Sequence, residues 1–278
     1  MKRMFVKLAD RDSVLNGEMF LKDEIRYNLL HLICGSPEAL RIKRRNEDLI
    51  FAQTPGFNPW LWLSPELAEE QKDEMLRKLA EHVSSREFPG VSADPETAES
   101  FARYYASVRG LQYETFMTLE AYTCSEIRPP AGVEGVIERA NARHAERVAA
   151  DMSAFSKEVF GFTPMPDEVY RAATAAIGTG GLYLWNAGGA PVAMARIAHR
   201  TARHARINDV YTPPGERKKG YASAIVAAIS GYCIREGLTP MLYADVNNPD
   251  SNKVYRSIGF AGAGRIADIR FRPPGPRS

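Results

Sequence analysis

A basic, glycine-containing loop between a predicted strand and a predicted helix is the stretch of this sequence best suited to chemistry. It lies within Asp209–Ser223, which reads DVYTPPGERKKGYAS. A strand, a loop and a helix in that order direct backbone N–H groups at an anionic group. Gly220 and Ala222 stand where the helix starts, and small residues there let a ligand approach the backbone closely. The N–H groups of the first turn and the helix dipole favour a pyrophosphate.

Three basic residues in the same loop, Arg217, Lys218 and Lys219, would add charge-assisted hydrogen bonds to that pyrophosphate. The alternative is a surface loop with solvated lysines. A short basic string with a glycine does not distinguish a pyrophosphate site from a solvated loop. The sequence around the loop is needed to choose between the two interpretations.

A second block follows one predicted helix and one predicted strand later. It runs from Asn248 to Phe260 with the pattern N-x-x-S-x-x-x-Y-x-x-x-G-F. Together with the R-x-x-G-x-A of the loop, it resembles the GNAT superfamily of acetyl-coenzyme A-dependent N-acetyltransferases. The resemblance covers about residues 133–271. The family usually has glycine where this chain has Lys218, and this departure puts the affinity for the coenzyme in question.

The resemblance implies a binding site for acetyl-coenzyme A as co-substrate. Backbone groups at the end of the strand before the loop would bind the pantetheine arm, and the loop N–H groups would hold the pyrophosphate. In the second block Asn248 and Asn252 are further candidates, since Asn252 is one turn from Tyr255. The implied coenzyme-binding residues are Val210, Tyr211, Thr212, Arg217, Lys218, Lys219, Gly220, Tyr221, Ala222, Asn248 and Asn252.

Tyr255 matches the tyrosine that protonates the departing thiolate in the family. Attack of an amine on the thioester passes through an oxyanion, which backbone N–H donors can hold. A phenol within hydrogen-bonding reach can then deliver a proton to the coenzyme A thiolate. The alternative is a core aromatic residue with only its hydroxyl satisfied.

The general base stays open. Asp209, just before the strand end, and Glu126, at the predicted domain junction, are carboxylate candidates. His199 and His204 have a suitable intrinsic pKa, although solvated histidines in an arginine-rich loop are the preferred interpretation. Deprotonation through water is also possible.

A run of basic residues surrounds a predicted hairpin, the arginine-rich loop named above. It would attract the ribose phosphate of the coenzyme or an acidic substrate, but a solvated loop is the preferred interpretation. Its members are Arg196, Arg200, Arg203 and Arg206.

The element pattern predicts an α/β (mixed α+β) fold, and the resemblance to the GNAT superfamily implies a central mixed, mostly antiparallel sheet flanked by helices. Residues 1–45 are expected to be helical, followed by strands at Leu49–Ala52 and Trp60–Leu63. The proline-rich stretch Arg128–Gly132 indicates a linker. The predicted domains are therefore 1–130 and 131–278, the second catalytic. The first has no second R-x-x-G-x-A loop; it is expected to be a degenerate GNAT-like copy or a cap, an arrangement that resembles tandem members such as the mycothiol synthase family.

Composition limits the possible functions. The formal net charge is +2, too small to indicate nucleic acid or an anionic membrane as a bulk partner. The three cysteines, Cys34, Cys124 and Cys233, are widely spaced, so neither a zinc site nor a disulfide framework is expected. No signal peptide or membrane span is recognised, and cytoplasm is the expected compartment.

The sequence thus predicts an enzyme that transfers an acetyl group to a primary amine on a small molecule or peptide, without a metal. A non-catalytic acyl-coenzyme A-binding regulatory module is the alternative, and nucleic-acid binding is a third, less favoured one. The acceptor, the acyl chain and the choice between monomer and homodimer stay open.

Overall fold

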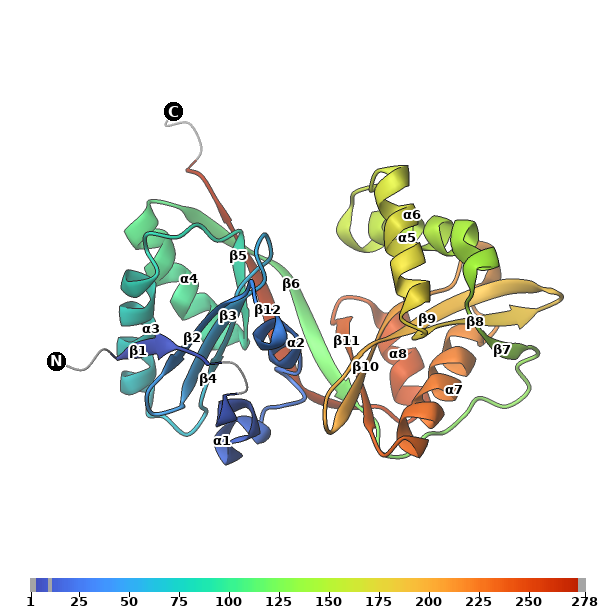
Figure 1. Ribbon diagram of the computed structural model, residues 1–278, viewed down its shortest axis with the longest axis horizontal. Coiled ribbons are helices and arrows are strands. Elements are labelled where there is room, and N and C mark those ends of the chain that lie inside the picture. Colours follow the sequence, from blue (N-terminus) through green and yellow to red (C-terminus); the bar gives the residue numbers. More distant parts are fainter. Residues whose placement is uncertain (1–3, 10–11, 275–278) are drawn as a thin grey trace. The chain divides into compact units, whose positions relative to one another are not determined.

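The computed structural model describes residues 4–9 and 12–274. The chain divides into two compact units, each containing strands and helices (Figure 1). Unit 1 consists of Met1–Ala121, Ala244–Asn247 and Ala263–Ser278; unit 2 consists of Tyr122–Tyr243 and Asn248–Gly262.

Unit 1 contains a mixed sheet with the strand order β1-β2-β3-β4-β5-β12-β6. The pairs from β1 to β4 and the pair β5–β12 are antiparallel, whereas β4 and β5 are parallel because α3 connects them. Its elements are β1 (Phe5–Lys7), η1 (Ser13–Asn16), α1 (Glu18–Leu21), α2 (Leu29–Gly35), β2 (Leu40–Arg44), β3 (Leu49–Gln53), β4 (Trp60–Leu63), α3 (Glu69–His82), β5 (Gly90–Ala93), α4 (Pro95–Arg109), β6 (Gln112–Thr123) and β12 (Ala261–Arg272).

Unit 2 repeats this pattern with the order β7-β8-β9-β10-β11. The first three pairs are antiparallel, and β10–β11 is parallel across the connection through α7. Its elements are β7 (Val136–Arg139), η2 (Ala142–His144), α5 (Ala145–Phe160), α6 (Pro166–Gly178), β8 (Leu182–Ala187), β9 (Ala190–Arg200), β10 (His204–Tyr211), η3 (Pro214–Glu216), α7 (Tyr221–Arg235), β11 (Thr239–Asp245) and α8 (Pro249–Ser257).

The predicted helical stretch at residues 1–45 is only partly helical. Three short helical segments lie within it, and Asp12 caps the first by accepting from the N–H of Val14. The strands β1 and β2 flank these segments and pair with each other. The prediction was wrong about these strands because β1 has only three residues and β2 alternates apolar with charged residues over only five, too few for a clear period of two.

Other local predictions are confirmed where short-range chemistry is strong. The strands β3 and β4 pair antiparallel, as expected from the two apolar runs. Asp94 caps α4 by accepting from the N–H of Thr97, and Pro95 occupies the first turn. Gly188 and Gly189 have positive φ angles of 58° and 83°, as a two-residue hairpin between β8 and β9 requires.

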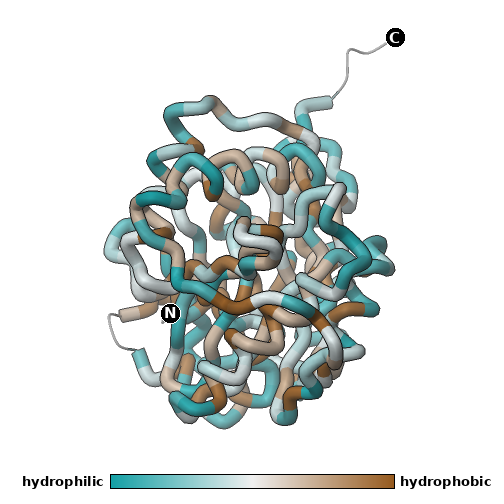
Figure 2. The backbone as a smooth tube through the Cα atoms, turned by 90° about the vertical axis from the view of Figure 1, so that its right-hand side faces the viewer, coloured by the Kyte–Doolittle hydropathy of each residue, from teal (hydrophilic) through white to brown (hydrophobic). Residues whose placement is uncertain are grey.

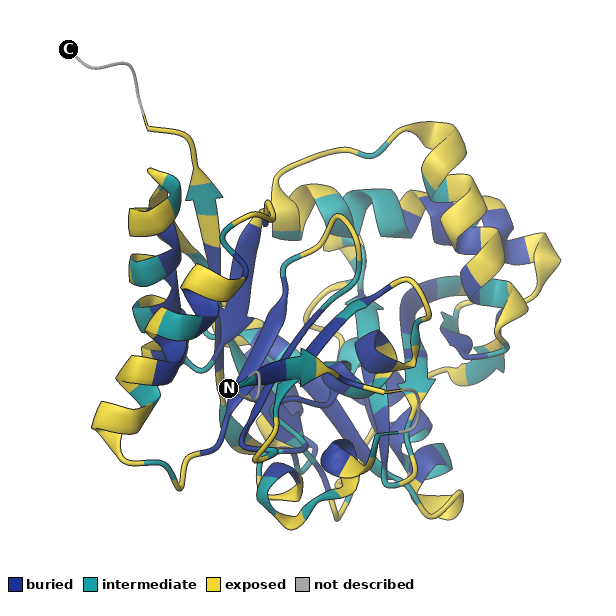
Figure 3. Ribbon diagram, turned by 60° about the vertical axis from the view of Figure 1, so that its left-hand side comes forward, coloured by how far each residue is buried: buried dark blue, intermediate teal, exposed yellow. Residues whose placement is uncertain are grey.

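The strands carry the buried apolar residues of each unit, while the outer faces of the helices are exposed (Figure 3). In unit 1 the core lies between the sheet and helices α3 and α4, with Phe51, Phe101 and Tyr105 fully buried. In unit 2 a core formed by α5, α6 and β8–β10 includes Val148, Leu184, Met194 and Tyr211. The core of unit 2 fixes the strand ends from which the candidate site is built.

The compact units differ from the predicted halves 1–130 and 131–278. The last strand, β12, pairs with β5 from Ala267↔Ala93 to Arg270↔Gly90, and so most of it belongs to unit 1. A local pattern indicates a strand but not the partner with which it pairs, which is why the sequence placed β12 with its neighbours in the chain.

Hydrophobic and hydrophilic stretches alternate along the backbone (Figure 2). Among the helices of residues 4–9 and 12–274, none combines the length and the apolar character needed to cross a membrane.

Candidate functional site

A break in strand pairing opens the sheet of unit 2 beside the predicted pantetheine strand. The β10–β11 ladder holds only from His204↔Thr239 to Arg206↔Met241, although both strands run further. On its other side, β10 has a register shift between Asn208 and Tyr211 against β9. The extra residue is a β-bulge, which bends a strand and re-aims its backbone groups.

Asp209 forms this bulge with a left-handed backbone, at a φ of 51°. Aspartate is one of the few residues that tolerate this conformation, because its short side chain hydrogen-bonds locally. Val210, Tyr211 and Thr212 follow the bulge, on the part of the chain that has left the ladder with β11. Their backbone groups can therefore pair with an extended ligand, as the predicted pantetheine contact requires.

The start of α7 has the features expected of an anion site. Gly220 is its N-cap with a φ of 84° and makes no side-chain cap. The first helical hydrogen bond is donated by the N–H of Ala224 to the carbonyl of Gly220 at 2.9 Å. The N–H groups of Tyr221, Ala222 and Ser223 thus stand at the positive end of the helix dipole without a capping side chain.

Close packing gives Gly220 a second reason to be glycine. A Cβ at this position would lie 2.7 Å from Cγ2 of Val133, closer than real contacts allow. Both the positive φ and this contact exclude larger residues, so the loop keeps the shape that exposes its N–H groups.

The basic side chains of the loop are largely engaged within unit 2. Arg217 donates from Nε to the carbonyl of Thr212 (2.9 Å) and from Nη2 to Glu158 (2.6 Å). Lys219 pairs with Glu216 at 2.8 Å. These contacts hold the loop in place, and the backbone N–H groups are then its main anion donors. Lys218 is exposed.

Glu158, on α5, is a functional candidate that the sequence reading missed. It also accepts from the hydroxyl of Tyr211 at 3.1 Å, and the Arg217 guanidinium lies 5.7 Å from the Tyr211 ring centroid. A carboxylate in the last turn of a helix opposes the helix dipole, and this unfavourable position was the available signal that it has a cationic partner.

Lys218 stands where the family usually has glycine, and its φ is +62°. A left-handed backbone costs a non-glycine residue about 1–2 kcal/mol. Glycine avoids this cost but loses about 0.5–1 kcal/mol of stability, because its unfolded chain has more conformational entropy to lose on folding. We therefore expect Lys218→Gly to raise the free energy of unfolding by roughly 0.5 kcal/mol in a denaturant titration. Lys219 has no positive φ, so Lys219→Gly is the control and should lower it. A loss of stability in Lys218→Gly would contradict this account of the loop.

The second block forms α8 and its cap. Asn248 caps the helix by accepting from the N–H of Ser251 at 3.0 Å. The amide of Asn252 is occupied on both sides: Nδ2 donates to the carbonyl of Asn248 (2.7 Å), and Oδ1 accepts from the hydroxyl of Tyr122 (2.8 Å). Both side chains thus hold α8 in position, and a contact with the coenzyme stays a prediction.

Tyr255 is buried, with only 7% of its surface exposed. Its ring lies 6.1 Å from those of Tyr122 and Phe260. Burial, with a smaller contribution from Tyr122, raises the pKa of the Tyr255 phenol well above its usual value. The hydroxyl is therefore protonated at neutral pH, as a general acid must be.

The candidate bases differ in their surroundings. Burial raises the pKa of Asp209 above its ordinary value, against the opposing effects of Arg196 and Arg206. Glu126 is exposed. His204 is buried, and Nδ1 of His199 accepts from Nε of Arg206 at 3.1 Å. The expectation of two solvated histidines was wrong, because the hairpin strands are longer than predicted and leave His204 buried and His199 half-buried.

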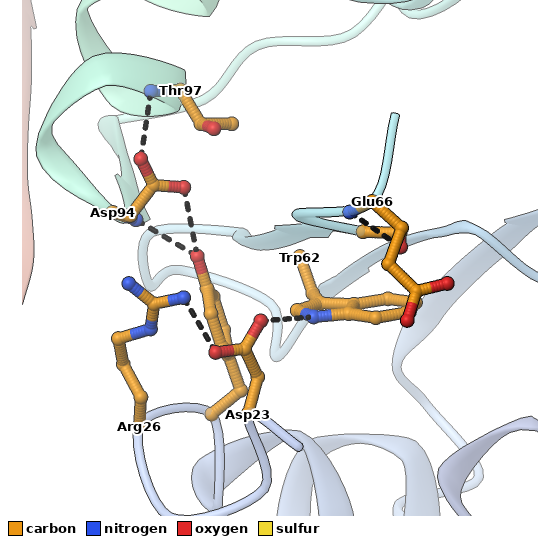
Figure 4. A network of polar contacts seen from close by, with 8 residues as sticks. Asp23, Arg26, Trp62, Glu66, Asp94 and Thr97 are labelled. Atoms are coloured by element: carbon orange, nitrogen blue, oxygen red, sulfur yellow. Dashed lines mark hydrogen bonds and ion pairs between the residues drawn. The ribbon is translucent and has the colours of Figure 1, made fainter. Parts of the chain in front are cut away.

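The corresponding place in unit 1 is filled by side chains. Tyr27 is fully buried, accepts from the N–H of Asp94 (2.9 Å) just after β5, and donates to the Asp94 carboxylate (3.2 Å). On β4, the indole of Trp62 donates to Asp23 at 3.1 Å (Figure 4). The helix after β4, α3, begins with the acidic residues Glu69 and Glu70 in its first turn. This end of unit 1 therefore repels the anion that α7 favours.

Comparison with known proteins identifies the architecture. The model of the acetyltransferase (GNAT) family matches residues 137–260. No curated protein matches the chain. Solved structures share the fold over nearly the whole chain, at low identity.

Three of these structures are a Drosophila protein, a GCN5-related N-acetyltransferase from Sphaerobacter thermophilus and an acetyltransferase of the GNAT family from Colwellia psychrerythraea. The first has a TM-score of 0.65 at 14% identity and covers 98% of this chain and 99% of its own. The second has 0.63 at 14%, covering 99% and 98%. The third has 0.57 at 15%, covering 96% and 99%.

The likeness extends over the N-terminal part, so the predicted GNAT-like fold of that part is confirmed. Residues 137–260, with their bulged β10, their uncapped α7 and their buried Tyr255, are the part of the chain that matches the acetyltransferase (GNAT) family.

Proposed function

We propose that the protein transfers the acetyl group of acetyl-coenzyme A to a primary amine of a small molecule or a peptide, in unit 2. The observation that carries this proposal is the presence of three features in one compact unit: the strand whose pairing with β11 ends at Arg206, before Val210, the uncapped start of α7 at Gly220, and the buried phenol of Tyr255. Pantetheine, pyrophosphate and thiolate each require one of them.

Backbone groups bind the coenzyme in this proposal. Val210, Tyr211 and Thr212 pair with the amides of the pantetheine arm, and the N–H groups from Arg217 to Ala222 hold the pyrophosphate. Arg217 acts by fixing the loop to Thr212 and Glu158. The exposed Lys218 and the nearby Lys219 add positive charge, which is favourable to a dianionic ligand.

The amine attacks the thioester carbonyl directly. The bulged backbone near Val210 supplies N–H donors for the oxyanion, in a geometry fixed before the reaction starts. As the carbon–sulfur bond breaks, Tyr255 gives its proton to the departing thiolate. Burial raises the pKa of the phenol, so Tyr255 holds its proton until the thiolate forms.

Asp209 is the base that we propose for the amine. Its carboxylate side chain is 19% exposed and lies 3.6 Å from Nη1 of Arg196. Its raised pKa makes it a stronger base than an exposed carboxylate. Its position next to Val210 also places it beside the backbone that would bind the thioester.

Replacement of Asp209 by asparagine should stabilise the protein while lowering its activity. A carboxyl group whose pKa is raised by folding stabilises the protein below its unfolded-state pKa, and this stability is lost as the pH rises through the folded-state pKa. At pH 7 the charged Asp209 therefore costs stability, and Asp209→Asn, which also tolerates the left-handed backbone, should raise the melting temperature. It should lower kcat/KM about 100-fold. A melting temperature that falls at pH 7 but not at pH 4 would contradict the assignment.

The function itself is tested by thiol release. Purified protein with acetyl-coenzyme A and a panel of primary amines should release coenzyme A and form the acetylated amine, followed by mass spectrometry. Coenzyme binding without acyl transfer to any amine would instead support the regulatory module. Absence of both binding and release would overturn the proposed function.

A further inference from the structure

Five polar residues lie together where β10 leaves its ladder in unit 2. Across the β9–β10 pair, Asn208 faces Arg196 and Arg206 faces His199. Asp209 follows at the bulge, with its carboxylate 3.6 Å from Arg196. Arg206 is also the last residue that pairs with β11. The set therefore borders the position at which the thioester is proposed to lie.

The charges of this set do not balance. Arg196 and Arg206 are two permanent cations, and both act on the single carboxylate of Asp209. Among residues 4–9 and 12–274, no carboxylate lies within ion-pair distance of Arg206. Nε of Arg206 donates instead to Nδ1 of His199, at 3.1 Å. One positive charge is thus left over in a half-buried setting.

Such an excess is costly unless a ligand balances it. Arg196 is 23% exposed, and desolvation lowers the pKa of the Arg206 guanidinium. Two further polar atoms are buried without a hydrogen-bond partner within the described ranges: Nε of Arg196, a donor, and Oδ1 of Asn208, an acceptor. A ligand with both an anionic acceptor group and an N–H donor would satisfy both.

The basic run along the β9–β10 hairpin also contains a solvated arginine for comparison. Arg200 is 39% exposed and forms two hydrogen bonds to Glu236, at 2.8 and 3.3 Å. It is a surface ion pair of the kind expected from the sequence. That expectation was wrong for Arg196 and Arg206, which are half-buried and turn toward Asp209.

We propose that the acceptor of this acetyltransferase is an amine that carries a carboxylate close to its amino group, as in an amino acid. The guanidinium groups of Arg206 and Arg196 take the carboxylate, and Asn208 and Asp209 face the amino group. Arginine binds carboxylates with two parallel hydrogen bonds, which would orient the amine as well as attract it. This inference rests on the proposed function in unit 2.

Matched pairs of acceptors test it without any mutation. Each pair is an amino acid and its carboxamide, which keeps the amine and its side chain but removes the negative charge. We expect kcat/KM to be at least about 100-fold higher for the amino acid in the pairs that react, the loss typical of one buried charged partner. Equal or greater rates with the carboxamides would overturn the inference and leave acetyl transfer itself intact.

Variants then assign the preference to the cluster. Arg206→Gln should remove most of the difference between the two acceptors of a pair while leaving the KM for acetyl-coenzyme A within about two-fold. Arg200→Gln, from the same run, is the control and should keep the preference. If Arg206→Gln lowers the rates of both acceptors by the same factor, the carboxylate is not bound there and the inference fails.

The two proposals fail differently. If no acceptor of any pair is acetylated, the proposed function falls and the acceptor class with it. If acetylation occurs without a preference for the carboxylate, only the acceptor class falls. The pair assay uses the unmodified protein, so its result does not depend on how the Arg206 variant folds.

Discussion

Tyr255→Phe is expected to lower kcat by at least about 100-fold, the usual contribution of a general acid. The KM for acetyl-coenzyme A should change less than two-fold, because the phenol acts on the leaving thiolate and not on the bound ground state. The ring itself packs against Tyr122 and Phe260, and phenylalanine keeps these contacts. Steady-state thiol release over a range of coenzyme concentrations measures both constants.

Two controls make this result specific. Tyr170, on α6, is 48% exposed, and Tyr170→Phe should leave kcat unchanged. Because burial raises the pKa of Tyr255, the wild-type rate should also show no loss near pH 10 from ionisation of an ordinary tyrosine. Full activity of Tyr255→Phe would remove the general-acid role and favour solvent as the proton donor.

Gly220→Asp is expected to weaken acetyl-coenzyme A binding at least about 100-fold, which corresponds to about 2.7 kcal/mol. The left-handed backbone alone costs a side chain about 1–2 kcal/mol, and a Cβ would lie 2.7 Å from Val133. A carboxylate at the start of α7 would also repel the pyrophosphate. Isothermal titration calorimetry gives the affinity and the number of sites, which we expect to be one per chain.

Gly237 is the matched control at the other end of the same helix. Its φ is +77°, and nothing lies within 4 Å of its Cβ position. Gly237→Asp therefore carries a similar backbone cost and the same added charge, yet it should bind the coenzyme as the wild type does. If Gly237→Asp weakens binding as much as Gly220→Asp, the effect is one of folding and the placement of the pyrophosphate is wrong.

We expect one binding site for acetyl-coenzyme A per chain because the described part of unit 1 lacks the features that form the site in unit 2. Its sheet repeats the order of unit 2, but Tyr27 and Asp23 bridge to the ends of β5 and β4, where unit 2 opens. The first turn of α3 holds Glu69 and Glu70 instead of small residues. A second equivalent of acetyl-coenzyme A bound with similar affinity would contradict this interpretation of unit 1.

Sequence reasoning reached the features that depend on short-range chemistry. The loop and the start of α7 could be predicted because glycine and alanine at a strand–helix junction have few other uses. Tyr255 was predicted as the general acid because the block from Asn248 to Phe260 resembles that of the GNAT superfamily, and this role stays a prediction. The predicted binding roles of Lys218, Asn248 and Asn252 were less specific, and the structure engages Asn248 and Asn252 in capping and packing α8.

Long-range contacts were the part that sequence reasoning did not reach. Glu158 lies 59 residues before Arg217, and no local pattern connects them. The cluster at Arg196, Arg206 and Asp209 depends on the register of β9 and β10 and on the bulge at Asp209. A bulge shifts a register by one residue and changes which side chains meet, so a reading by alternation alone took these arginines for a solvated run.

Hydrogen exchange with and without acetyl-coenzyme A tests the central claim most directly, because it reports on the backbone groups themselves. We predict that amides in 210–212 and 217–223 exchange more slowly with the coenzyme bound, whereas amides in 64–71, at the start of α3, do not change. Protection confined to residues 64–71, or none in 210–223 at saturating coenzyme, would contradict the assignment of the site to unit 2.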